Sequence, residues 1–261
     1  AANLERLAFD RDSLEEARMN TAIICINGIR ARAASSRGWT DEFVTALNTR
    51  TPASVKVEKF EYDCSALLRR LHQRARVDEV ARMANRYRHA GYRVVLVGHS
   101  NGCDIIARVL LLNVDVDTVH LFAPAADEED FEQVLLYDGV RRIHIYGSQD
   151  DHALKGASLS RKLIGWLGLG YGSLGLRGAE FAAKHPGVVR DHSIHGYGHS
   201  TWFTPGFTME QTLKLLLAND ADDVKELEGP PTQKLPETPT QETPKAQAAT
   251  AAGELRNPFD P

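Results

Sequence analysis

The sequence contains little that would suit it to a membrane or to nucleic acid. No apolar run approaches the roughly 20 residues that a membrane helix needs, and no basic segment leads into an apolar one near the start, as it would in a signal peptide. The 31 Lys and Arg residues are outnumbered by 35 Asp and Glu, so the net charge of −4 gives no general attraction to nucleic acid. We therefore expect no membrane span, no signal peptide and no nucleic-acid partner.

Cysteine is also scarce. The three cysteines, Cys25, Cys64 and Cys103, are scattered and odd in number, so we expect no disulfide framework. Two of them lie in strongly apolar segments, which favours buried, reduced thiols and a cytoplasmic location. With 261 residues, of which 43% are hydrophobic, the chain can bury a core without disulfides or a structural metal.

The composition changes after LKLLLAND, which ends at Asp220. Seven of the eleven prolines lie between Pro230 and Pro261, and large apolar residues almost vanish from about residue 219. Such a segment cannot bury enough apolar area to offset its conformational entropy. We expect one domain over residues 1–218 and a Pro/Thr/Ala-rich disordered tail over 219–261. The tail would either keep the protein soluble or bind a protein partner through its end, NPFDP.

Within the domain, short apolar segments alternate with amphipathic ones. Continuous apolar runs such as VVLV are typical of strands covered on both faces, whereas SVKVEKF alternates and suits a sheet edge. Thr40 is a candidate N-cap of one helix, and Gly91 would close a long helix over about residues 65–89. The pattern predicts an α/β fold, a mostly parallel doubly wound sheet of about six to seven strands with helices on both faces. The predicted strands are residues 21–28, 54–62, 93–100, 118–125, 141–148 and 188–196.

The segment GHSNG, residues 98–102, matches G-x-S-x-G in a specific context. It directly follows the most apolar predicted strand and directly opens a predicted helix. A nucleophile elbow needs this strand–turn–helix setting, because the serine must stand on a sharp, strained turn. Gly98 and Gly102 would let the strand and helix pack closely, and the Asn101 amide would lie at a helix N-terminus, where an oxyanion is stabilised. Ser100 is therefore a candidate nucleophile.

On these residues the chain resembles the α/β-hydrolase superfamily, in its serine esterase or lipase-like form and in a compact version, over about residues 20–218. The resemblance implies a triad ordered serine, acid, histidine along the chain. The acid would follow the strand two after the elbow, in SQDD, where the frequent pattern G-x-x-D indicates Asp150. Asp151 is the neighbouring alternative, and Asp127 is the alternative one strand earlier.

The resemblance places the histidine after the last strand, in HGYGHSTWF. His199 is the expected general base, with His195 as a fallback, while His192 suits a strand side chain. The three histidines could also be read as zinc ligands, but two glycines interrupt their spacing. A formal G-x-G-x-x-G at residues 170–175 follows no strand, which argues against dinucleotide binding. We expect neither a cofactor nor a metal.

The loop after the first predicted strand would border the site. The resemblance makes the main-chain N–H of Ile29 the second oxyanion donor, although Asn27 replaces the usual histidine before Gly28. Arg30 follows and is either a solvated loop residue or a contact for an anionic substrate group. The Gly-, Leu- and aromatic-rich segment over residues 165–178 could be a flap or an ordinary packed loop. Candidate pocket residues are Trp166, Tyr171 and Trp202.

These features predict a serine hydrolase that cleaves a carboxylic ester or thioester, a small-molecule acyl substrate, through an acyl-enzyme. One alternative is an acyltransferase that uses the same triad with an alcohol or thiol as acceptor. The other is a non-catalytic member of the same fold that serves as an interaction module, with its tail as the docking segment.

Overall fold

The computed structural model describes residues 20–28, 39–62, 73–137, 139–156 and 172–228. These residues form an open, six-stranded parallel sheet with the strand order β2-β1-β3-β4-β5-β6. The sheet confirms the predicted fold class, and all six predicted strands are present. The strands are β1 (Thr21–Ile26), β2 (Val55–Phe60), β3 (Arg93–His99), β4 (Val116–Phe122), β5 (Val140–Tyr146) and β6 (Val189–Asp191).

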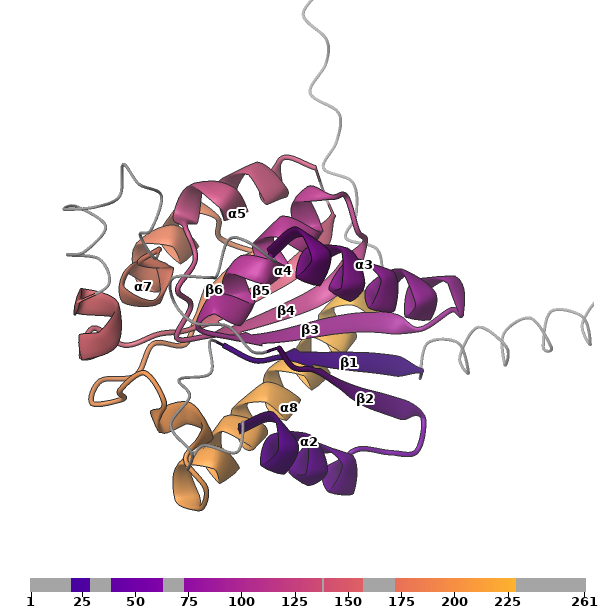
Figure 1. Ribbon diagram of the computed structural model, residues 1–261, viewed down its shortest axis with the longest axis horizontal. Helices are drawn as coiled ribbons and strands as arrows, with labels where there is room; N and C mark the ends of the chain where they lie inside the picture. The colour runs from indigo at the N-terminus through magenta and orange to yellow at the C-terminus, as the bar shows by residue number, and fades with distance from the viewer. Residues whose placement is uncertain (1–19, 29–38, 63–72, 138, 157–171, 229–261) are drawn as a thin grey trace, which may run out of the picture.

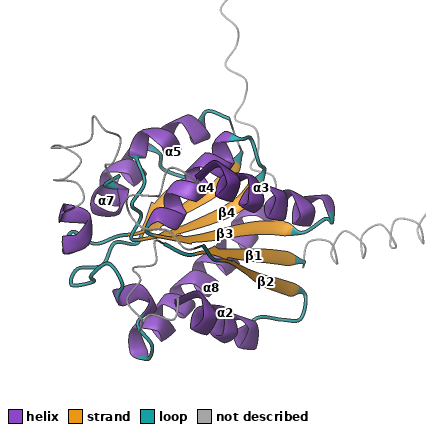
Figure 2. Cartoon of the chain, in the orientation of Figure 1, coloured by secondary structure: helices purple, strands orange, loops and turns teal. Residues whose placement is uncertain are grey.

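Helices cover both faces of the sheet (Figures 1 and 2). One face carries α3 (Gln73–His89), α4 (Asn101–Leu111), α5 (Glu128–Leu135) and α7 (Leu174–Lys184). The other face carries α2 (Trp39–Arg50), the short 3-10 helix η2 (Thr201–Phe203) and α8 (Phe207–Glu228). Because both faces are covered, alternate residues of a central strand enter different cores: Val94 and Leu96 pack under α3 and α4, and Val95 and Val97 pack under α2 and α8.

The strand order changes direction between β1 and β3. The chain first adds β2 outside β1 and then returns to build β3 to β6 on the other side. The adjacent strands β1 and β3 therefore lead to helices on opposite faces of the sheet, α2 and α4, and the point between them is a topological switch point, where open α/β sheets commonly bind ligands. The chain places Gly28 and Ser100 at this switch point.

One helix start differs from the sequence expectation, and one helix end agrees with it. Thr40 is not an N-cap, because α2 begins at Trp39 and the Thr40 hydroxyl instead donates to the Glu61 carboxylate. The long helix α3 is described from Gln73 only, and it ends as expected before Gly91, whose φ of 80° suits the glycine.

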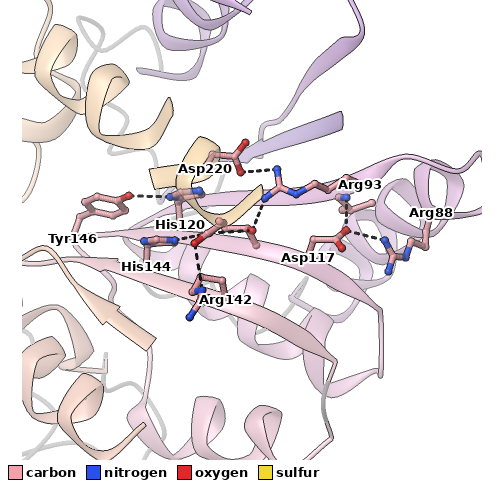
Figure 3. Close-up of polar contacts among 11 residues, drawn as sticks. Arg88, Arg93, Asp117, His120, Arg142, His144, Tyr146 and Asp220 are labelled. Carbon is pink, nitrogen blue, oxygen red and sulfur yellow. Dashed lines mark hydrogen bonds and ion pairs between the residues drawn. The ribbon is translucent and has the colours of Figure 1, made fainter. Parts of the chain in front are cut away.

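The last helix extends beyond the domain end that composition indicated. Helix α8 continues past residue 218 to Glu228, and two of its carboxylates return to the sheet. Asp220 pairs with Arg93 at 2.7 Å (Figure 3), and the fully buried Asp223 accepts a hydrogen bond from His144 at 2.8 Å. The boundary at residue 218 is therefore too early, because composition does not show which polar residues have buried partners. Residues 229–261 lie outside the described residues.

Two further expectations concern the thiols and the membrane. Cys25 and Cys103 are buried free thiols, and burial raises the pKa of Cys25 to about 12. Cys64 lies outside the described residues. None of the described helices has the length and apolarity that crossing a bilayer requires.

Candidate active site

Ser100 stands on a strained turn between β3 and α4. Its backbone has φ 55° and ψ −122°, a conformation that costs a non-glycine residue about 1–3 kcal/mol. The surrounding structure holds it there: the Ser100 N–H donates to the Phe122 carbonyl at 3.0 Å, and the Ser100 carbonyl accepts from Ala125 at 3.2 Å. The side chain makes no capping bond to α4. The Ser100 hydroxyl is thus left for another partner, as a nucleophile elbow requires.

Two glycines allow the close approach of neighbouring segments to this turn. A Cβ on Gly102 would lie 2.5 Å from the Ile26 carbonyl oxygen, so only glycine lets α4 begin against the end of β1. A Cβ on Gly28 would lie 2.9 Å from the Ser100 Cβ. Gly28, which follows β1, therefore lies directly beside the serine.

His199 links the serine to a buried carboxylate. Its Nε2 lies 2.8 Å from the Ser100 Oγ, and its Nδ1 lies 2.8 Å from Oδ2 of Asp151. Because a carboxylate only accepts, Nδ1 carries a proton, and Nε2 of the neutral ring accepts the serine O–H. The Asp151 side chain is 2% exposed and that of His199 is 22% exposed. The carboxylate is thus shielded from water while the imidazole edge stays accessible, an arrangement suited to general-base catalysis.

Several solved structures have a fold similar to that of this chain. A Thermus thermophilus protein, TT1662, aligns with a TM-score of 0.53 at 14% identity, over 79% of this chain and 90% of that one. The butyrate-bound esterase Est2 from Thermogutta terrifontis aligns with a TM-score of 0.50 at 14% identity, over 79% and 84%. An uncharacterized Bacillus cereus protein aligns with a TM-score of 0.53 at 13% identity, over 85% and 68%. The chain has the α/β-hydrolase fold. No protein-family model and no curated protein sequence matches it.

Within this α/β-hydrolase fold, the carboxylate on His199 is Asp151 and not Asp150. The expectation for Asp150 is wrong: its side chain is 50% exposed and accepts a hydrogen bond from the Gly196 N–H at 2.8 Å. The alternative Asp127 lies at the start of α5. The structure thus brings Ser100, His199 and Asp151 together and directs Asp150 to the main chain of the histidine loop, residues 192–199.

The turn after β5 explains the shift by one residue. The Asp151 N–H donates to the Ser148 carbonyl at 3.2 Å, which turns Asp151 inward, and its Oδ1 caps the following turn by accepting from Leu154 at 3.0 Å. Burial alone would raise the pKa of the Asp151 carboxyl, but hydrogen bonds from His199, Leu154 and Ala153 outweigh burial and hold that pKa below its usual value. Asp151 therefore stays ionised beside the imidazole, and the same side chain both caps the turn and orients His199.

The other two histidines of the loop have separate partners. His195 is 89% exposed, and its Nδ1 lies 3.8 Å from Asp150. His192 bonds to His144 instead, with 2.8 Å between ring nitrogens. In the part of the chain that the structure describes, no three His, Cys, Asp or Glu side chains converge as metal ligands would. The geometry does not support the zinc interpretation of these three histidines.

The walls of the site are described only in part. Asn101 opens α4 beside the serine, which places its main-chain N–H at the start of a helix. The other expected wall residues, Ile29, Arg30, Trp166 and Tyr171, lie outside the described residues. Trp202 is described and is not a pocket residue: it is 1% exposed and packs against Phe122 and Tyr197.

The segment proposed as a flap is an ordinary packed segment where the structure describes it. Leu174 and Gly175 donate main-chain hydrogen bonds at 3.2 and 3.0 Å to the carbonyls of Ala126 and Pro124, and α7 then covers β5 and β6. Sequence reasoning missed this helix because its glycines suggested a loop. It also missed His99, whose ring contacts the histidine loop. Side chains alternate between the two faces of a strand, and this rule would have placed His99 on the same buried face as Val95 and Val97.

Proposed function

We propose that the protein is a serine hydrolase that cleaves carboxylic esters or thioesters, with Ser100 as nucleophile, His199 as general base and Asp151 as the orienting carboxylate. The observation that carries the proposal is the unbroken hydrogen-bonded line from a buried carboxylate through an imidazole to a serine on a strained turn. A serine hydroxyl is a weak nucleophile alone, and an adjacent base oriented by a third group is what activates it.

The proposed reaction has two steps. His199 Nε2 accepts the Ser100 proton as Oγ attacks the carbonyl carbon, and the Asp151 carboxylate stabilises the imidazolium that forms. The main-chain N–H groups of Asn101 and Ile29 are the proposed donors to the oxyanion. The imidazolium then protonates the leaving oxygen or sulfur, whose bond to the carbonyl carbon breaks as the tetrahedral intermediate collapses to the acyl-enzyme. Water, deprotonated by His199, hydrolyses the acyl-enzyme and restores Ser100.

The Thermogutta esterase with bound butyrate supports a short acyl chain as the first substrate to test. The fold and the triad do not encode the acyl group, so a series of p-nitrophenyl esters of increasing chain length would define it. The buried free thiols of Cys25 and Cys103 support our proposal of a reducing, cytoplasmic environment.

The experiment is the hydrolysis of p-nitrophenyl butyrate by the full chain and by Ser100→Ala. We expect kcat/KM to fall by at least about 10⁴-fold in the variant, because a triad without its nucleophile retains only background catalysis. Ser193→Ala is the matched control, since its exposed hydroxyl bonds to Asp191 and not to the triad. Undiminished hydrolysis by Ser100→Ala, or no hydrolysis of any ester in the series by the wild-type protein, would refute the proposal.

A further inference from the structure

His99 is the last residue of β3 and directly precedes the proposed nucleophile. Its side chain is 8% exposed and lies on the sheet face covered by α2 and α8. The His99 Nε2 lies 2.9 Å from the main-chain carbonyl oxygen of His199. Its ring centroid is 5.1 Å from the His199 ring and 5.2 Å from the Phe203 ring. The residue before the serine thus contacts the main chain of the residue proposed as base.

The chemistry of this contact determines which nitrogen of the His99 ring carries a proton. A carbonyl oxygen only accepts, so His99 Nε2 carries the proton and donates it. Burial lowers the pKa of His99 to about 3; the charge of the nearby His199 acts in the same direction, and the hydrogen bond to the His199 carbonyl acts against it without reversing the shift. His99 therefore stays neutral at neutral pH. A neutral donor can hold His199 without repelling the imidazolium that the proposed reaction forms on it.

The His199 main chain needs such a support because its loop is rich in glycine. Gly196 has φ 80°, and its N–H is held by Asp150, while Gly198 is held by a local bond to Thr201. The first bond lies before His199 in the chain, and the second closes a turn around His199 without tying it to the sheet. The bond from His99 acts on His199 itself and ties it to β3, the strand that carries Ser100.

We propose that His99 is a positioning residue: it fixes the main chain of His199 relative to Ser100, and so sets the approach of the base to the nucleophile. The inference rests on the proposed function. It assigns His99 no contact with substrate, so its loss should reduce kcat and leave KM nearly unchanged. A misplacement of about 1 Å between catalytic groups can cost about 100-fold in rate.

The test compares His99→Leu, His99→Gln and His99→Asn in p-nitrophenyl butyrate hydrolysis. We expect His99→Leu to lower kcat by about 10- to 100-fold with KM within about threefold. Glutamine places an amide N–H near the position of Nε2 and should restore most of kcat, whereas asparagine is too short. If His99→Leu does not fold, the order Gln above Asn still tests the proposal.

His120→Leu is the matched control, because it makes the same change at a buried histidine of β4 on the same sheet face, bonded to Tyr146 at 3.0 Å. Its kcat should stay near the wild-type value. Equal kcat losses in His99→Leu and His120→Leu, or equal kcat in His99→Gln and His99→Asn, would overturn the positioning role. An active wild-type protein with unimpaired His99 variants refutes this inference alone, whereas an inactive wild-type protein refutes the proposed function as well.

Discussion

Two Asp–His pairs in this protein have hydrogen bonds of equal length, made through different ring nitrogens, and different surroundings. At the carboxyl edge of the sheet, Oδ2 of Asp151 lies 2.8 Å from Nδ1 of His199. Where α8 packs on the sheet, Oδ2 of Asp223 lies 2.8 Å from Nε2 of His144. The first pair continues to the Ser100 hydroxyl, while the second continues to a ring nitrogen of His192. We call Asp223, His144 and His192 the buried histidine chain.

The comparison teaches what makes an Asp–His pair fit for catalysis. In the buried histidine chain, Asp223 and His144 are fully buried, and Arg142 neutralises the carboxylate from 3.3 Å. At the other pair the imidazole is accessible and the third group is a strained serine at a helix N-terminus. A short Asp–His bond is therefore common to a structural and a candidate catalytic unit, and the nucleophile and its access distinguish them.

Replacing the acid of each pair should separate the two roles most strongly. Asp151→Asn should lower kcat by about 10³- to 10⁴-fold, because the amide favours the wrong imidazole tautomer, as established for the trypsin triad. Asp223→Asn should leave kcat within about threefold of wild type, since its chain does not reach the serine. Steady-state hydrolysis of p-nitrophenyl butyrate checks both. Similar kcat losses in the two variants would show that the comparison is wrong.

For stability we expect the opposite order: Asp223→Asn should lower the free energy of unfolding more than Asp151→Asn does. Asp223→Asn removes the charge that faces Arg142 and His144 in a fully buried site, and breaking a buried pair costs about 3 kcal/mol. Asp151→Asn keeps an amide oxygen that can cap Leu154 and should cost less. Urea unfolding measures both free energies of unfolding, and a larger loss for Asp151→Asn would contradict the assignment of roles.

Acid should act on the buried histidine chain through His192. Burial and the neighbouring His144 lower the pKa of His192 from 6.5 to about 4. The unfolded chain therefore binds a proton that the folded chain does not, so the free energy of unfolding falls as pH drops from 6.5 to about 4. His192→Gln should weaken this pH dependence of the urea midpoint, whereas His195→Gln, at an exposed site, should leave it unchanged. An unchanged dependence in His192→Gln would be the contrary result.

The smallest effect on activity is expected when Asp150, the neighbour of Asp151, is replaced. Asp150 holds the Gly196 N–H from an exposed position, so Asp150→Ala should lower kcat/KM by less than about fivefold. Comparison with Asp151→Asn in the same assay distinguishes the two neighbours. A loss for Asp150→Ala as large as that for Asp151→Asn would mean that the carboxylates share the role.

The sequence predicts the sheet and the strand–turn–helix setting of Ser100 well because both depend on local patterns. Continuous apolar runs bounded by turns locate the strands, and GHSNG combines strand, turn and helix within five residues. The choice between Asp150 and Asp151 depends on how one turn rotates, and neither spacing nor residue type determines that rotation. The predicted end of the domain is too early for a related reason. Asp220 and Asp223 are polar residues whose partners are far away in the sequence, and composition does not reveal such partners.

We propose that Ser100 alone among the serines is activated. Treatment of the full chain with a fluorophosphonate probe, followed by peptide mass spectrometry, tests it most directly. We predict one adduct per chain on the peptide that contains Ser100, lost in Ser100→Ala and formed much more slowly in Asp151→Asn. A folded wild-type protein that forms no adduct, or one whose adduct maps to another residue, would contradict the account.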